Sequence, residues 1–365
     1  YIAEFYRACG YEVITNDNGA NVYIGIATTL IKHSDFSMKV AGDVLVLEVD
    51  EGNLGKVSEA IRPEKIVITN LFQDQVDRFG CAKELAEKMA KTFPNESKIF
   101  VNGDDPMVNY LASLVDNEKI YYSVDCIDAG YFVDVSCPKC GKQLEYSKRV
   151  YDHLGIFNCK CGYKHQMPNF VAKNINGRNF TIAKKKYKAP EDVIYMVYNS
   201  VAALAVGISD KLSEDKMYEI LANIKVGNGR LQKFKFNGYD SFINLVKNPA
   251  GANLSIDLIR KSKVPYNILI GVNRNEADGL DDSWIESILF EHLVSSPLNA
   301  IYLLGQSADL LEKTIVGRLP GHKVIKGNIN SLVSKMELDG KAGYFLANYT
   351  MLASVREVLE KKNYL

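Results

Sequence analysis

The chain has 365 residues, 47% of them hydrophobic, which is enough for two or three domains with sizeable cores. Lys and Arg together number 44, as do Asp and Glu, so no global charge points to nucleic acid or to an anionic membrane as a partner. We see no apolar run of about eighteen residues and no signal peptide, and we therefore expect a cytoplasmic protein without a transmembrane segment.

Strands and helices alternate along the first third of the chain, in the pattern typical of a doubly wound α/β domain. The pattern predicts strands at 12–15, 44–47, 66–68 and 98–101, and helices at 1–9, 24–32, 82–92 and 107–114. A turn rich in Asn, Gly and Asp follows at 102–106, where these residue types indicate ordinary turn chemistry.

Acidic and amide side chains follow the apolar runs 44–47 and 66–68. Ligands bind beyond the carboxyl ends of strands in open α/β sheets, and Mg²⁺ prefers hard oxygen ligands. Two acidic clusters at neighbouring strand ends therefore suit a magnesium–phosphate site. The alternative is a pair of solvated loops that cap buried strands. The residues concerned are Glu48, Asp50 and Glu51 after the first run, and Asn70, Asp74, Gln75 and Asp77 after the second.

Two close cysteine pairs interrupt the alternation. Cys137 and Cys140 are separated by eighteen residues from Cys159 and Cys161, and this spacing predicts the two knuckles of a zinc ribbon. Four thiolates leave no open coordination position, so the zinc is expected to be structural. A disulfide interpretation is weaker, because the chain otherwise looks intracellular and its other cysteines are scattered along the sequence. His153 and His165 lie nearby, and we expect both to be bystanders because four sulfur ligands suffice.

The α/β pattern returns after the ribbon, with a strand at 180–182 and helices at 193–206 and 212–224. A second α/β unit begins near Phe234. It has expected strands at 242–246, 266–272, 300–304, 324–326 and 343–347, a helix from Leu254, and a closing helix. The second unit is therefore expected to be Rossmann-like.

Two further features of this half could carry chemistry. Arg230 is flanked by glycine and could reach a phosphate, although a surface turn would have the same sequence. Asp278, Asp281 and Asp282 crowd one loop beside Trp284, the only tryptophan. That loop is either functional or a solvated loop anchored by a buried tryptophan.

These motifs together resemble the central and C-terminal domains of Mur ligases, which make amide bonds through an acyl phosphate. Within that group the chain is most similar to the MurT family, the ligase-like subunits of lipid II isoglutaminyl synthase. The resemblance covers essentially the whole chain. It rests on NDNGAN at 16–21, LEVDEG at 47–52, TNLFQDQVDRFG at 69–80, VNGDDP at 101–106, YNSVAALA at 198–205, NGR at 228–230, NLVKNPAGAN at 244–253, ADGLDDSW at 277–284, NYT at 348–350 and the inserted four-cysteine ribbon.

The resemblance implies a domain division and a fold. Residues 1–225 would be the ATP-binding central domain, with the zinc ribbon inserted at about 127–175, and residues 226–365 would be the C-terminal domain. The chain departs from the family in two places. The glycine-rich nucleotide-binding loop of Mur ligases is not found, and we expect it to lie upstream of Tyr1. In addition, Ile285, Glu286 and Ser287 stand where the family tends to have an aromatic residue and an aspartate.

The resemblance also implies an activity. The chain would use ATP and Mg²⁺ to phosphorylate the α-carboxylate of D-glutamate in the lipid II stem peptide, at the membrane surface. A glutaminase subunit of the GatD type would form a heterodimer with it and supply ammonia. The implied roles place Mg²⁺ at Glu48, with Asn70 and Asp74 lining the same site. Asn199, Arg230, Lys247 and Asn248 would contact nucleotide, and Asp281 would complete the partner's Cys–His pair.

Two other functions stay open at this point. A stand-alone amino-acid ligase of the Mur or folylpolyglutamate type would be expected to carry a histidine where this chain has Gln75. A non-catalytic zinc-ribbon protein on a decayed ligase fold would need no nucleotide loop at all.

Overall fold

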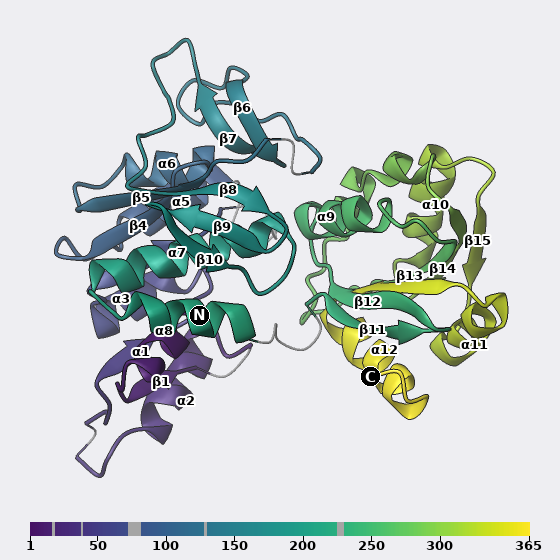
Figure 1. Cartoon of the computed structure of the whole chain (residues 1–365), viewed down its shortest axis with the longest axis horizontal. Helices are drawn as coiled ribbons and strands as arrows, with labels where there is room; N and C mark the ends of the chain where they lie inside the picture. The colour runs from purple at the N-terminus through teal and green to yellow at the C-terminus, as the bar shows by residue number, and fades with distance from the viewer. Residues whose placement is uncertain (17–18, 38, 72–81, 128–129, 225–229) are drawn as a thin grey trace. The chain divides into compact units, whose positions relative to one another are not determined.

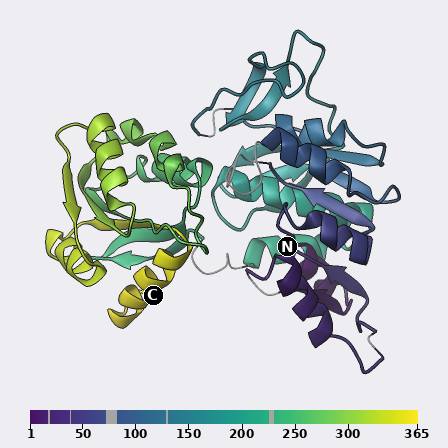
Figure 2. The ribbon, with the colours of Figure 1, turned by 180° about the vertical axis from the view of Figure 1, so that it is seen from behind.

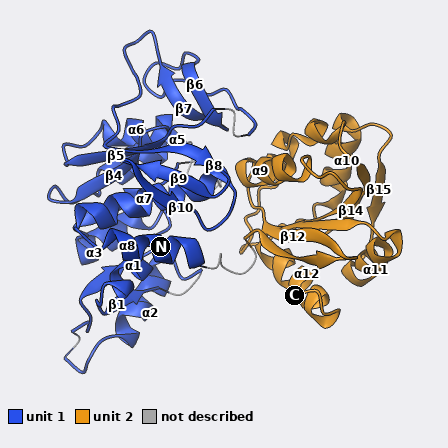
Figure 3. Cartoon of the chain, viewed as in Figure 1, with its two compact units in different colours: residues 1–225 blue, residues 226–365 orange. Residues whose placement is uncertain are grey.

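The structure, a computed structural model, describes residues 1–16, 19–37, 39–71, 82–127, 130–224 and 230–365. The chain divides into two compact units, Tyr1–Lys225 and Val226–Leu365 (Figure 3). Each unit has its own sheets and core, and each is described by itself.

Unit 1 is built on a six-stranded sheet with the order β10-β9-β8-β5-β4-β3 (Figure 1). Strands β3, β4, β5 and β8 run parallel, and β9 and β10 extend the sheet with antiparallel pairs. The bounds are β3 Lys65–Ile68, β4 Lys98–Asn102, β5 Lys119–Val124, β8 Phe170–Asn176, β9 Asn179–Ile182 and β10 Lys185–Lys188.

Alternate residues of the parallel strands enter two cores on opposite faces, as a period of two requires. Ile66, Ile68, Ile99 and Val101 pack with helices α5 (Ala82–Ala90) and α6 (Pro106–Ala112). Val67 and Phe100 pack with α7 (Ile194–Ser209), whose small residue Ala205 is fully buried against them. Unit 1 is completed by α1 (Ile2–Ala8), α2 (Tyr23–Lys32), α3 (Leu54–Ile61) and α8 (Glu214–Asn223).

A separate two-stranded parallel sheet holds β1 (Val13–Thr15) and β2 (Val44–Val46). The predicted strand 44–47 is therefore present, but the expectation that it neighbours the strand at 66–68 is wrong for the described residues. In them β2 pairs only with β1, whereas β3 is an edge strand that pairs with β4. The cause is topological, because strand composition does not specify which strands pair.

The ribbon leaves the main sheet after β5 and returns to it at β8. It contains the antiparallel hairpin of β6 (Glu145–Tyr151) and β7 (Leu154–Asn158). This hairpin and α2 lie at opposite ends of unit 1, as both views show (Figures 1 and 2). The insertion was expected to extend to about 175, whereas Phe170–Asn176 is already β8 of the main sheet.

The ribbon shares part of its core with the main sheet. Five of its buried side chains belong to the same hydrophobic cluster as the residues of β3, β4, α5 and α6, namely Cys137, Leu144, Phe157, Cys159 and Tyr163. We therefore expect the stability of the ribbon and the packing of this face of the main sheet to be coupled.

Unit 2 is a six-stranded sheet with the order β11-β12-β16-β13-β14-β15. All its neighbouring pairs are parallel except the edge pair β11–β12. The Rossmann-like expectation for this unit is confirmed. The strands are β11 Gln232–Phe236, β12 Tyr239–Leu245, β13 Tyr266–Gly271, β14 Leu298–Leu304, β15 Lys323–Lys326 and β16 Ala342–Ala347.

Helices α11 (Ile329–Asp339) and α12 (Tyr349–Lys361) bury Leu332, Met336 and Val355 in one core with β13, β14 and β16. The other helical segments of the unit are α9 (Pro249–Ile259), α10 (Ala308–Arg318) and the 3₁₀ turns η1 (Ser283–Ser287) and η2 (Phe290–Leu293).

Helix α9 begins at Pro249, more than a turn earlier than the expected start at Leu254. The side chain of Asn248 accepts a hydrogen bond from Gly251 N–H at 2.9 Å and so caps the helix. A proline in the first turn has no N–H that would need a partner. Asn-Pro is thus a helix start here, and the glycine that follows is tolerated because its N–H is capped.

Among the described residues, no helix combines the length and the apolar character that crossing a membrane would require.

The shared core leads to a prediction about metal removal. We expect one Zn²⁺ per chain, and we expect a chelator or Cys159→Ser to destabilise unit 1 as a whole rather than the hairpin alone. Loss of several kcal/mol would lower Tm by roughly 10 °C for a domain of this size. Metal analysis together with calorimetry measures both effects.

Cys9→Ser is the matched control, because Cys9 is a free cysteine outside the four-cysteine group. A zinc content near zero in protein purified without chelator would contradict the prediction. So would a chelator that leaves Tm unchanged.

Candidate functional site

The four ribbon cysteines converge on one point. One sulfur from each of Cys137, Cys140, Cys159 and Cys161 lies within 4.8 Å of the others. The Sγ atoms of Cys137 and Cys161 are 3.7 Å apart, and those of Cys140 and Cys159 are 3.5 Å apart. These separations match tetrahedral thiolate ligands around one Zn²⁺, whose Zn–S bonds are about 2.3 Å long. The residues therefore fit a structural zinc.

The thiols of this group are unequal. Burial raises the pKa of Cys137 to about 12, whereas the backbone N–H of Tyr163 lowers the pKa of Cys161 to about 7. A buried thiol that resists ionisation on its own is stabilised as a thiolate when a cation binds it. The group is thus suited to binding a metal. A reactive cysteine would instead be expected as a single thiol with a lowered pKa.

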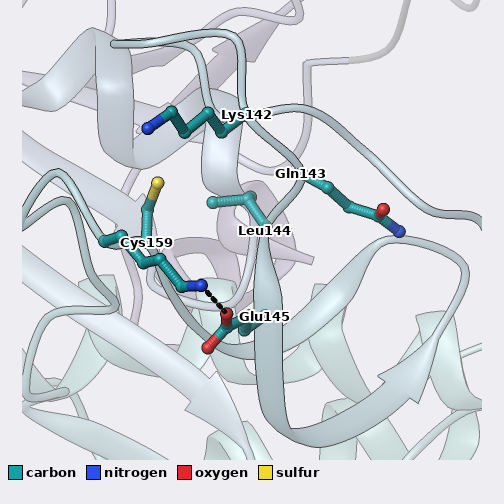
Figure 4. A pocket seen from close by; sticks show the side chains of 6 residues that line it. Lys142, Gln143, Leu144, Glu145 and Cys159 are labelled. Atoms are coloured by element: carbon teal, nitrogen blue, oxygen red, sulfur yellow. Dashed lines mark ion pairs between the residues drawn. The ribbon is translucent and has the colours of Figure 1, made fainter.

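A depression lies on the ribbon beside this cluster (Figure 4). The only predicted site residue in its wall is the candidate zinc ligand Cys159, and Lys160 Nζ lies 3.9 Å from Glu145 Oε1 across it. The depression is therefore a surface feature of the ribbon and separate from the predicted ligase residues. Its wall consists of Lys142, Gln143, Leu144, Glu145, Cys159 and Lys160.

The turn after β4, expected to be ordinary turn chemistry, holds two buried carboxylates. Asp104 is 1% exposed and Asp105 is 0% exposed. Asp104 accepts hydrogen bonds from Ser123 Oγ at 2.7 Å, Val124 N–H at 2.9 Å and Tyr198 Oη at 2.7 Å. Asp105 caps α6 by accepting from Met107 N–H and Val108 N–H.

Each of these carboxylates also pairs with a ribbon histidine. His165 Nε2 lies 2.9 Å from Asp104 Oδ1, and His153 Nε2 lies 3.3 Å from Asp105 Oδ2. The two histidines lie outside the four-cysteine group, as expected, but they are not bystanders, because they join the ribbon to the main sheet. Sequence patterns do not reveal these pairs because nothing local links residues that are so distant in the chain, 61 positions apart for His165 and Asp104.

His153 is held between two carboxylates, since its Nδ1 lies 2.9 Å from Asp152 Oδ1. Burial alone would lower the pKa of His153, but the carboxylates of Asp105 and Asp152 outweigh it and raise that pKa to about 10. The imidazole is therefore a cation at neutral pH, and both its N–H groups donate. Tyr131 Oη donates to the other oxygen of Asp152 at 2.5 Å.

The backbone that follows β3 carries Asn70 and is held by side chains. Tyr122 Oη donates to Ile68 O at 3.0 Å, Asn102 Nδ2 donates to Thr69 O at 2.8 Å, and Leu71 N–H donates to Asp105 Oδ2 at 3.2 Å. The Asn70 side chain itself is exposed. The predicted site residue Asp74 lies outside the described residues.

Glu48 follows β2, and its backbone is fixed while its carboxylate is exposed. The buried side chain of Asn16 donates to Glu48 O and accepts from Glu48 N–H, both at 2.9 Å. Within the described part of the chain, no ion pair or hydrogen bond occupies the Glu48 carboxylate, and none joins it to Asn70. A positioned carboxylate without a cation is a suitable Mg²⁺ ligand.

The predicted nucleotide residues divide between the two units. Asn199 lies on α7 and is half-buried. Its neighbour Tyr198 bonds to Asp104, so Asn199 and Asn70 both adjoin residues that contact the 102–106 turn. In unit 2, exposed Arg230 lies two residues before β11, and exposed Lys247 precedes Asn248, whose side-chain oxygen caps α9.

The acidic loop of unit 2 has one projecting carboxylate between two that are tied down. Asp278 accepts from Thr350 N–H at 2.9 Å and from the Thr350 hydroxyl, and Asp282 accepts from Ser307 Oγ at 2.7 Å. Asp281 is exposed, and hydrogen bonds from Ser283 hold its pKa below the usual value. Trp284, which would be a buried anchor in the solvated-loop alternative, is only half-buried.

Comparison with protein families assigns both units. Residues 3–133 match the Mur ligase middle domain, and residues 245–352 match the MurT ligase C-terminal domain. The first match contains Glu48 and Asn70, and the second contains Lys247, Asn248 and Asp281.

Solved structures share the fold. A pseudomurein peptide ligase type C from Methanothermus fervidus superposes with a TM-score of 0.75 at 22% identity, over 99% of this chain and 75% of the other. MurF ligase from Thermotoga maritima in complex with ADP gives 0.65 at 13% identity, over 99% and 77%. Unit 1 and unit 2 thus have the Mur ligase fold.

Curated relatives extend over nearly the whole chain. The lipid II isoglutaminyl synthase (glutamine-hydrolyzing) subunit MurT of Staphylococcus aureus strain COL is 31% identical over 97% of this chain and 82% of its own length. The subunit of the same name from Streptococcus pneumoniae strain R6 is 28% identical over 96% and 81%. The chain therefore belongs to the MurT family of Mur ligase-like proteins.

Proposed function

We propose that this chain is the ATP-dependent ligase subunit of a glutamine-hydrolysing lipid II isoglutaminyl synthase. It converts the α-carboxylate of D-glutamate in the lipid II stem peptide to the amide, giving D-isoglutamine. The observation that carries this proposal is the 31% identity with the S. aureus subunit along 97% of the chain, which includes both matched Mur ligase regions.

The chemistry has two steps. A carboxylate oxygen of D-glutamate attacks the γ-phosphorus of ATP, and ADP leaves with the electrons of the broken P–O bond. Ammonia then attacks the carbonyl carbon of the acyl phosphate, phosphate leaves, and the nitrogen loses a proton to give the amide. Phosphorylation is needed because a carboxylate is a poor electrophile, and bound cations stabilise the charge that develops on the phosphoryl group.

The residues of unit 1 are suited to the first step. Glu48 offers an exposed carboxylate on a fixed backbone for Mg²⁺, and Asn70 projects from a backbone held by Asn102 and Asp105. Asp74 is proposed to line the same site. Bound Mg²⁺ would neutralise the charge of the phosphate groups, and these side chains would hold the metal ion in place.

The remaining nucleotide contacts are proposed for Asn199 of unit 1 and for Arg230, Lys247 and Asn248 of unit 2. The two cations, Arg230 and Lys247, are exposed, and a guanidinium and an ammonium both suit phosphate oxygens.

A stand-alone amino-acid ligase is the alternative function, and two observations favour the amidating enzyme. Gln75 stands where amino-acid-adding Mur ligases usually have a histidine, and the C-terminal unit matches the MurT family specifically. The likeness to the peptide ligase and to MurF is below 25% identity and shows the fold alone.

The word subunit in the relatives' names implies a partner. We propose a GatD-type glutaminase that supplies ammonia, with Asp281 as the third group of its Cys–His pair. A carboxylate in that position holds the imidazole in the required tautomer and stabilises the imidazolium that forms. Exposure and a lowered pKa keep Asp281 ionised and accessible, whereas the scaffold occupies both its acidic neighbours.

Glu48→Ala tests the magnesium assignment. We expect acyl phosphate formation to fall by roughly 10²–10³-fold, as for loss of a group that stabilises transferred charge. The fold should be kept, because the substitution removes an exposed side chain. ADP release measured with lipid II and ATP–Mg²⁺ reports the effect. Glu59→Ala, an exposed acid on α3, is the control, and unchanged turnover in Glu48→Ala would show that the metal lies elsewhere.

Asp281→Asn tests the partner role. It keeps the size of the side chain but removes its charge, so the complex should assemble and lose glutamine-dependent amidation by roughly 10²–10⁴-fold. Amidation with free ammonia at high concentration should return, because the ligase site is unaltered. Isoglutamine formation from each nitrogen source is the measurement.

The best control in this loop is Glu286→Gln, which removes an exposed charge five residues away. Asp278→Asn and Asp282→Asn are expected to have weaker effects on glutamine use. Asp278→Asn should also lower stability, because the asparagine amide keeps only one of the two oxygens that accept from the Thr350 N–H and hydroxyl at the start of α12. Normal glutamine hydrolysis by Asp281→Asn in the complex would rule out the triad role.

A further inference from the structure

Asp105 Oδ2 has two donors from distant parts of the chain. One is the backbone N–H of Leu71 at 3.2 Å, and the other is Nε2 of His153 at 3.3 Å. The first belongs to the segment 69–71, which carries the candidate site residue Asn70. The second belongs to the turn of the β6–β7 hairpin in the ribbon. One carboxylate oxygen therefore connects the zinc-binding insertion with the candidate ligase site.

The connection is buried and charged. Asp105 is 0% exposed and His153 is 8% exposed. A carboxylate at such a position is destabilised unless cations and hydrogen-bond donors surround it. The protonated imidazole is the nearby cation, and Asp152 fixes its orientation through Nδ1. Asp105 Oδ1 is already used by the first turn of α6, so Oδ2 is the atom available to hold Leu71.

The hairpin is brought to this turn by backbone contacts as well. Gly155 N–H donates to Asp104 O at 3.0 Å, and a Cβ at Gly155 would lie 2.2 Å from Lys148 O. Only glycine permits this close approach of β7 to β6 within the hairpin. Tyr163 Oη donates to Pro106 O from the second cysteine knuckle. The hairpin and the knuckle thus both contact the turn 102–106, and four cysteines fix them relative to each other.

We propose that Asp105 and His153 are positioning residues for the ligase reaction. The ribbon, through His153, holds Asp105 in the orientation that fixes the Leu71 N–H, and so fixes Asn70 beside the reacting phosphate. This inference rests on the proposed function, because it assigns the use of the held segment. It gives the inserted zinc ribbon a task in catalysis although its four thiolates leave the metal no open position.

Two substitutions of His153 separate the contact to Asp105 from the rest of the environment. An asparagine amide matches the position of Nδ1, so His153→Asn keeps a donor toward Asp152 and loses the one toward Asp105. A glutamine amide matches Nε2, so His153→Gln keeps a donor toward Asp105. His165→Asn is the matched control, because it breaks the other histidine–aspartate pair, which ends at Asp104 and does not contact Leu71.

The test uses the full chain in complex with its glutaminase partner. Hydrogen exchange of peptides that contain Leu71 and kcat for ammonia-dependent amidation of lipid II are measured for each variant. Zinc content and Tm confirm that each variant is folded. We expect His153→Asn to speed exchange at the Leu71 amide by about tenfold and to lower kcat by about tenfold, as for a misplaced site residue. His153→Gln should largely restore both, and His165→Asn should change neither.

The proposal is overturned if His153→Asn exchanges and turns over like the unmodified chain, or if His165→Asn has the same effects as His153→Asn. The second result would mean that the ribbon contributes stability only. If the unmodified complex does not amidate lipid II, the proposed function fails. The exchange comparison would then decide alone whether His153 fixes Leu71.

Discussion

The burial of two adjacent carboxylates at the end of β4 is the constraint on which unit 1 depends. A buried anion is strongly destabilising unless donors and cations surround it. Asp104 and Asp105 recruit theirs from different parts of the chain, which include α7, the residues after β3 and the ribbon. The 102–106 turn therefore holds both α7, which carries the candidate site residue Asn199, and the segment after β3, which carries Asn70. Removing either carboxylate would leave several buried donors without an acceptor at once.

In unit 2, polar side chains likewise hold together the segments that follow the carboxyl ends of the strands. Asn348 accepts from Asn273 N–H and donates to Asn273 O, which ties the segment after β16 to the segment after β13. Asp278 and Asp282 fasten the acidic loop to this frame through Thr350 and Ser307. A loop held on both sides can present Asp281 to a docked protein with little loss of conformational entropy on binding. Precise presentation matters because a triad carboxylate works through geometry.

Much of this could be predicted from local patterns. The cysteine spacing, the apolar runs of the parallel strands and the two α/β units depend on neighbours in sequence, and the sequence motifs alone indicate the MurT family. The errors and omissions concern residues that are distant in sequence. Pairing of β2 with β1, the return of the ribbon to the sheet at Phe170 and the two histidine–aspartate pairs depend on topology. The start of α9 is a different case. Asn248-Pro249 is a local capping motif, so this start could have been predicted from the sequence.

The two histidine–aspartate pairs give a reason for a metal site in this insertion. The excursion between β5 and β8 is short, and part of its buried surface belongs to the core of the main sheet rather than to a core of its own. Placing a protonated histidine against Asp105 within hydrogen-bond distance nevertheless requires a rigid hairpin. Four thiolates on one Zn²⁺ would supply that rigidity independently of core size. In the proposed arrangement the metal holds the hairpin, the hairpin holds His153, and His153 orients Asp105 against the Leu71 N–H.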